Sequence, residues 1–112
     1  MKTQSELEDL ATRFLGAWNT QDVEAVLACY TEDLVYRDPN TRHEIVGAEA
    51  MRRYLTKLFA GWQMTWAARE VHAFATGEGA AVLWHATFKR VGQQDMVEAD
   101  GMDLVCLVGD RI

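Results

Sequence analysis

The residue with the clearest potential for chemistry is Asp38, an aspartate that immediately precedes the only proline of the chain. Side chains alternate between faces along a β-strand, so Leu34, Tyr36 and Asp38 should share one face of the run 34–38. A residue before proline is held extended, which sets the direction of the Asp38 side chain. A carboxylate aimed into an apolar pocket loses hydration and becomes a usable base near neutral pH. Asp38 is therefore a candidate general base, and the alternative is a surface Asp-Pro pair that begins a turn.

Asp103 is the second candidate, because it lies between Met102 and Leu104 in an apolar run near the end of the chain. A carboxylate in such surroundings is costly unless it is paired or protonated. Asp103 could therefore be an acid/base group, or it could be a structural aspartate of the sheet that bonds to a neighbouring arginine or tyrosine. The Asp100-Gly101 pair suggests a β-bulge, which would change the face on which Asp103 lies.

The histidines and cysteines show no spacing that would predict a metal site. His43 is expected at the surface, and His85 on the sheet face opposite Trp84. Cys29 and Cys106 lie in apolar surroundings, and we expect both as buried, reduced thiols. Such thiols are typical of a reducing compartment, so the sequence favours a cytoplasmic protein without a metal.

Composition narrows the possible partners. The 112 residues are 49% hydrophobic, which suits one domain with a single core and a pocket. No apolar run approaches the roughly 20 residues that span a bilayer, and residues 1–6 lack a signal-peptide pattern. The net charge of −6 argues against nucleic acid or an anionic membrane as a partner. A small apolar molecule is the expected ligand.

The first half of the chain predicts three helices. Ser5 and Glu8 form a capping box for the first helix, Asp22 caps the second, and Gly47 precedes the third. Apolar residues recur in each at the spacing of one buried stripe. Residues 40–46 form a polar, irregular connection. The expected buried stripes run from Leu7 to Trp18, from Val23 to Tyr30 and from Met51 to Phe59.

The second half predicts an antiparallel sheet of three runs, about 63–75, 80–91 and 95–108, joined by hairpins. The last run is apolar on both faces near its end. Two-sided apolarity in an antiparallel sheet implies that both faces are covered. Helices would cover one face, and we expect a second copy of the chain to cover the other, in a homodimer.

These elements predict an α+β fold, with three N-terminal helices packed on a curved antiparallel sheet. A sheet that curves over helices would leave a conical cavity. Its expected lining is aromatic: Phe14, Trp18, Tyr30, Tyr36, Tyr54, Phe59, Trp84 and Phe88.

The order and spacing of these elements resemble the nuclear transport factor 2-like superfamily. Within it, the chain resembles the ketosteroid isomerase and SnoaL-like polyketide cyclase group over residues 1–112. The resemblance rests on Ala17-Trp18-Asn19, the segment 22–30, Tyr36-Arg37-Asp38-Pro39, Gly47-Ala48-Glu49-Ala50-Met51 and the hairpins that end near Asp103. It implies a cone-shaped fold in one domain. Function varies within the superfamily, so the fold does not determine the reaction.

The resemblance assigns roles to both aspartates. Asp38 stands where the isomerases have their general base, and Asp103 where they have a protonated aspartic acid that hydrogen-bonds the enolate. Phe14 replaces a catalytic tyrosine and Leu55 a supporting one, and the loss of one such donor typically reduces the rate by roughly two to three decades. The resemblance also implies a further strand after Gly109-Asp110, which is missing or short here.

Two functions are consistent with these features. The first is a cofactor-independent enzyme of isomerase, cyclase or hydrolase type, in which Asp38 and Asp103 transfer protons on an apolar carbonyl- or hydroxyl-bearing substrate. A true steroid isomerase is not expected, because Phe14 cannot donate a hydrogen bond. The alternative is a non-catalytic ligand-binding or dimerisation module of the same fold.

Overall fold

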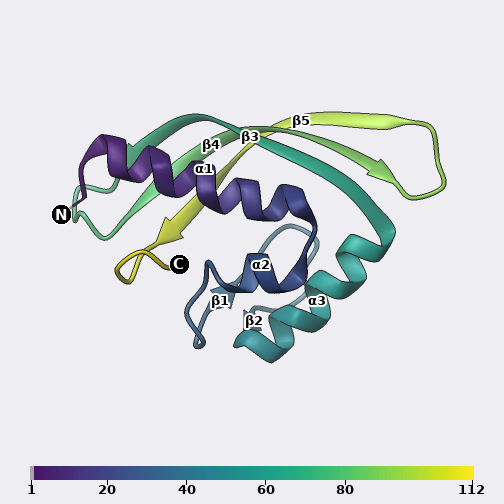
Figure 1. Ribbon diagram of the computed structural model, residues 1–112, viewed down its shortest axis with the longest axis horizontal. Helices are drawn as coiled ribbons and strands as arrows, with labels where there is room; N and C mark the ends of the chain where they lie inside the picture. Colours follow the sequence, from purple (N-terminus) through teal and green to yellow (C-terminus); the bar gives the residue numbers. More distant parts are fainter. Residues whose placement is uncertain (1) are drawn as a thin grey trace.

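The computed structural model describes residues 2–112 as three helices beneath a curved antiparallel sheet (Figure 1). The long sheet arches over α1, while α2, α3 and a short hairpin lie below (Figure 1). The predicted α+β architecture is confirmed. In chain order the elements are α1 (Gln4–Thr20), α2 (Val23–Leu27), β1 (Val35–Tyr36), β2 (Ile45–Val46), α3 (Ala48–Gly61), β3 (Trp62–Ala73), β4 (Gly79–Arg90) and β5 (Met96–Cys106).

Helix α1 begins at Gln4, and its N-cap Thr3 lies two residues before the predicted cap at Ser5. The capping box is formed by Thr3 and Glu6: the Thr3 hydroxyl accepts from the Glu6 amide, and the Glu6 carboxylate accepts from the Thr3 amide. The expected Ser5–Glu8 box is wrong, because Ser5 already lies inside the helix. The helix ends where Gln21 adopts a left-handed conformation with φ of 53°.

Two amide side chains fasten the end of α1 to β3. Asn19 exchanges hydrogen bonds with the backbone of Trp66, at 2.7 and 2.9 Å. Gln21 donates to the Trp62 carbonyl at 2.8 Å and accepts from the Met64 amide at 2.7 Å. Each amide pairs with the strand as a neighbouring backbone would. These bonds set the position of Trp18 beneath the sheet.

The segment 40–46, predicted to be irregular, contains a strand. Residues 45–46 pair antiparallel with residues 35–36, so a short hairpin carries the loop after Asp38. Its second strand leads directly into α3 through Gly47, whose φ of 87° is open to glycine and strained for other residues. The hairpin holds Asp38 beside the first half of α3.

The sheet has the order β3-β4-β5, and its register places Asp103 on the inner face. Asp103 lies directly opposite Val82, which is buried against the helices. Pairing of β4 with β5 is continuous, so the bulge expected at Asp100-Gly101 is wrong; the register shift lies in β3, between Ala68 and Glu70.

Gly101 serves a packing purpose instead of forming a bulge. It lies opposite Trp84, and a Cβ atom at this position would be 2.4 Å from the indole ring. The missing side chain therefore lets the Trp84 ring lie against the β5 backbone.

The outer face of the sheet remains apolar at one end. Met102 and Leu104 are 55% and 67% exposed, and Cys106, predicted to be buried, is exposed beside them. Among the described residues β5 pairs only with β4, and the backbone of Ile112 bonds to Cys29 and Thr31. No helix within residues 2–112 is long and apolar enough to cross a membrane.

Candidate functional site

Asp38 is held by four hydrogen-bond donors. Its Oδ2 accepts from the hydroxyls of Tyr36 at 2.7 Å and Tyr54 at 2.5 Å. Its Oδ1 accepts from the backbone amides of Asn40 at 2.7 Å and Thr41 at 3.1 Å. A carboxylate offers about four acceptor positions, so those of Asp38 are filled.

The local sequence explains half of this arrangement. Tyr36 lies two residues before Asp38 on the same strand face, and Pro39 directs the chain into a turn that returns two amides to the carboxylate. Tyr54 comes from α3, which the hairpin brings alongside. Asp38 therefore begins a turn, as one of the two predicted alternatives required. Its carboxylate is nevertheless half-buried and faces two tyrosines.

Both tyrosines are neutral in this environment. Burial raises the pKa of Tyr36 and of Tyr54, and the bonds each makes to the carboxylate of Asp38 raise it further. Each hydroxyl donates its proton to Asp38, so its oxygen is oriented as an acceptor for a third group.

Asp103 lies in a different environment. It is half-buried on the inner face, and burial is the main cause that raises its pKa. The nearby indole N–H of Trp84 opposes this rise, and the negative charge of Asp38 adds to it. Burial therefore favours the protonated form of Asp103.

All but Trp84 of the aromatic residues predicted to line a cavity pack in one cluster around Trp18. The Trp18 ring stacks on Tyr36 with centroids 5.9 Å apart, and Phe14 and Phe59 meet it edge-on. Trp66, which is not among the predicted lining residues, packs against both Trp18 and Phe88. The cluster connects the helices to the inner face of the sheet.

Two indole nitrogens in this region are buried without a hydrogen bond of normal geometry, those of Trp18 and Trp84. Trp18 lies near the hydroxyl of Tyr30, whose pKa is raised by burial, and Trp84 lies near Asp103. Buried donors without acceptors are rare in proteins and point to sites where a ligand or water is accommodated.

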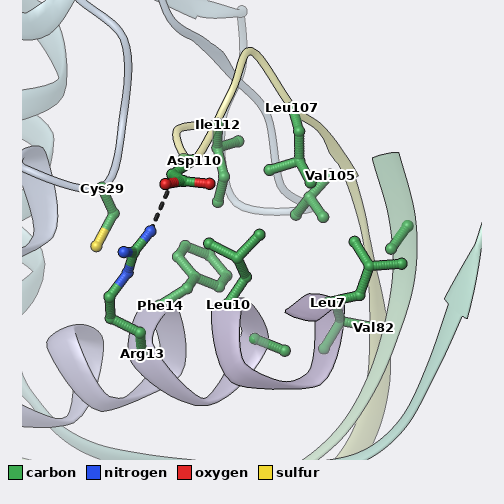
Figure 2. Close-up of a pocket in the computed structure, with 12 residues that line it drawn as sticks. Leu7, Leu10, Arg13, Phe14, Cys29, Val82, Val105, Leu107, Asp110 and Ile112 are labelled. Carbon is green, nitrogen blue, oxygen red and sulfur yellow. Dashed lines mark hydrogen bonds between the residues drawn. The ribbon is translucent and has the colours of Figure 1, made fainter. Parts of the chain in front are cut away.

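Neither Asp38 nor Asp103 lines either of the two cavities described here. One has a volume of about 20 Å³, room for about one water molecule. It is lined by Phe14, Val82 and other apolar residues, with Arg13 bonded to the Asp110 carbonyl at its edge (Figure 2). The other is an open cleft of about 340 Å³ that Tyr54 lines. Of the eight predicted lining residues, only Phe14 and Tyr54 line these cavities.

The other residues singled out in the sequence lie outside the aspartate site. Arg37 pairs with Glu44 at the surface, and His43 is exposed in the hairpin loop. His85 lies on the outer face and bonds to Asp100 at 2.8 Å. Within the described residues no group of three histidine, cysteine or acidic side chains is arranged to hold a metal ion.

The fold defines a class of protein, the cone-shaped α+β domain. A family model for the SnoaL-like domain matches residues 11–112. The chain therefore belongs to the SnoaL-like domain family. Among curated proteins, no match was found.

Solved structures of proteins with different descriptions share this fold. A ketosteroid isomerase-like protein from Erwinia carotovora atroseptica is 25% identical, with a TM-score of 0.71 over 90% of this chain and 79% of that chain. SalBIII, an epoxide hydrolase/cyclase-like enzyme of pyran ring formation in salinomycin, is 20% identical, with a TM-score of 0.81 over 96% and 84%. An LEH-like epoxide hydrolase from M. tuberculosis is 17% identical, with a TM-score of 0.77 over 96% and 77%. The fold is thus the nuclear transport factor 2-like cone.

Sequence reasoning missed the link between Tyr54 and Asp38. The two residues are 16 positions apart, and neither helical nor strand periodicity connects them. The available signal was the polar tyrosine on the buried stripe of α3, because a half-buried hydroxyl needs a partner.

Proposed function

We propose that this protein is a cofactor-independent enzyme that moves protons on a small apolar substrate bearing a carbonyl, epoxide or hydroxyl group. One contrast between two carboxyl groups supports the proposal: Asp103 lies on the inner face of the long sheet, and Asp38 lies in the loop that follows β1. Asp38 is saturated by donors, whereas Asp103 is half-buried among apolar groups.

The two groups suit opposite roles. Protonated Asp103 donates a hydrogen bond to the substrate oxygen, where negative charge develops as a carbon–hydrogen or carbon–oxygen bond breaks. Asp38 accepts the substrate proton at Oδ2, after the hydroxyl of Tyr36 or Tyr54 turns from the carboxylate toward the substrate. Returning that proton to a different atom completes an isomerisation, with no net change in protons.

The reaction class is supported by the structures of similar fold, which are described as isomerase-like, cyclase-like and epoxide hydrolase-like. A fold alone does not select among these reactions. Steroid isomerisation is the least favoured, because Phe14 offers no hydroxyl to the oxygen. Turnover of a Δ5-3-ketosteroid should be absent or very weak, and Phe14→Tyr should raise it.

A substrate panel tests the proposal. Purified protein is assayed with a Δ5-3-ketosteroid, a set of apolar epoxides and a set of cyclic β-keto esters, beside Asp38→Asn and Asp103→Asn. Activity on one class that both substitutions abolish, with unchanged circular dichroism, supports the enzyme. Activity that survives both substitutions contradicts the assigned roles.

The second candidate is a ligand-binding module that does not turn its ligand over. It is favoured by the four donors on Asp38, because a carboxylate whose acceptor positions are filled is a poor base until a donor leaves. This candidate predicts that an apolar ligand binds equally well to the parent protein and to Asp38→Asn, with no product.

We also propose a homodimer through the outer face of the sheet. Met102 and Leu104 form an exposed apolar patch there with Leu83. The charged groups beside the patch, His85 and Asp100, already satisfy each other. A second copy of the chain could therefore cover this face without leaving unpaired charges.

A further inference from the structure

An open cleft lies between the hairpin loop 40–46 and the first half of α3. Its volume of about 340 Å³ is within the range of about 300–1,000 Å³ that is usual for small-molecule sites. Of its lining residues, Tyr54 alone has a part in the proposed reaction, through its hydroxyl. The lining residues include Arg42, His43, Ile45, Val46, Ala50 and Tyr54.

Among the described charged side chains that line this cleft, Arg42 is the one without a partner. The carboxylate of Asp38 lies behind the loop, where the amides of Asn40 and Thr41 bond to it. The one acidic residue that lines the cleft, Glu44, already pairs with Arg37 at 3.6 Å. Glu49, close by at the start of α3, pairs with Arg52. Within residues 2–112, Arg42 makes no ion pair. Its guanidinium is therefore free to pair with an anion in the cleft, as the guanidinium of Arg53 is on the exposed side of α3.

The floor of the cleft is less polar than its rim. Ile45, Ala50 and Tyr54 are half-buried, whereas Arg42 and His43 are exposed. The Tyr54 hydroxyl is engaged with Asp38, so the part of Tyr54 that remains for a ligand is its ring. A ligand with an apolar body and one anionic end fits a cleft that has an apolar floor and a positively charged rim.

We infer that the cleft binds a small aliphatic or aromatic carboxylic acid in its ionised form. The carboxylate pairs with the Arg42 guanidinium, whose planar donors match the two oxygens, and His43 lies beside it. The apolar body lies on Ile45, Ala50 and the Tyr54 ring. Binding at this site does not depend on the proposed acid/base reaction.

Hexanoate is a suitable probe, with 1-hexanol as its uncharged analogue and hexylammonium as the analogue of opposite charge. Each is titrated into ¹⁵N-labelled protein while backbone amide shifts are followed. We expect saturable shifts within residues 40–46 and 50–54 for hexanoate, weaker ones for 1-hexanol and none for hexylammonium.

Substitutions then test the assigned contact. Arg42→Gln should weaken hexanoate binding by about fivefold, the effect expected for an exposed ion pair, and leave 1-hexanol unchanged. Arg42→Lys should retain part of the affinity, because it retains the charge. Arg53→Gln removes the same charge from an exposed position of α3 and should have no effect.

Three results would overturn the inference: equal binding of hexanoate and 1-hexanol, equal weakening by Arg42→Gln and Arg53→Gln, or no saturable shift at tens of millimolar hexanoate. The proposed enzyme activity is separable from these results. Asp103→Asn should abolish turnover and leave the hexanoate titration unchanged, because Asp103 does not line the cleft.

Discussion

Two aspartates three residues apart on β5, Asp100 and Asp103, experience opposite environments. Asp103 faces the helices, where burial raises its pKa. Asp100 faces outward, where its bond to His85 and the charge of Arg69 lower its pKa. An odd spacing along a strand places the two carboxyls on opposite faces, and each face then sets the chemistry of its residue. The comparison separates a desolvated carboxyl group on the inner face from a paired carboxyl group on the outer face.

The largest expected effect comes from the inner aspartate. Asp103→Asn should reduce turnover of any substrate by about a hundredfold or more, the usual contribution of a positioned acid. The measurement is kcat/KM beside a circular dichroism spectrum. A well-folded variant with full activity would remove Asp103 from the site.

The same substitution should change stability with pH. A carboxyl whose folded pKa is raised costs stability as pH rises through its unfolded pKa toward the folded one. Asp103→Asn should therefore be more stable than the parent at pH 7, and the difference should shrink below about pH 4. Chemical denaturation at both values measures it. An unchanged difference would mean that burial does not act on this group.

On the outer face, a charge should separate the two copies. Leu104→Glu places a carboxylate in the exposed apolar patch, so the sedimentation mass should fall from dimer to monomer. Val91→Glu, at an exposed valine outside the long strands, is the matched control and should leave the dimer intact. A parent protein that sediments as a monomer would contradict the dimer itself.

Gly101 has no side chain, and this leaves room for the Trp84 ring to lie against β5. Gly101→Ala should destabilise the fold by about 1–3 kcal/mol, because its Cβ would overlap the indole ring. Gly16→Ala in α1 meets no atom within 4 Å and should stabilise the fold by about 0.5–1 kcal/mol. Thermal unfolding of both variants gives the comparison; equal effects would show that Trp84 moves freely.

The smallest effect concerns the outer histidine. The bonds of His85 to Asp100 and Glu98 raise its pKa, so the stability they add is lost as pH rises through the folded pKa. Asp100→Asn should return the His85 titration toward its ordinary value, measured from its ring proton shifts. Asp95→Asn, elsewhere in the exposed hairpin, should not change it.

Periodicity predicted the elements well and the contacts between them poorly. It placed Tyr36 and Asp38 on one face and His85 opposite Trp84, because strand alternation is local. It missed the pairing of residues 45–46 with 35–36, because two-residue strands have no measurable period. The bulge expected from Asp100-Gly101 was wrong, because this glycine has a different purpose. Its missing side chain makes room for the Trp84 ring of the neighbouring strand, and a contact between strands cannot be read from local sequence.

By itself, the sequence determined the three helices and the antiparallel meander, and it singled out Asp38 and Asp103 while leaving the face of Asp103 open. These features depend on the spacing of residue types within one segment, which can be read directly from the sequence. The tertiary structure alone decided that Tyr54 reaches Asp38, that Trp84 lies near Asp103, and that Arg42 remains unpaired above a cleft. Each of these contacts depends on how separate helices and strands pack. Packing brings together residues that are far apart in the sequence, and their spacing does not indicate that they will meet.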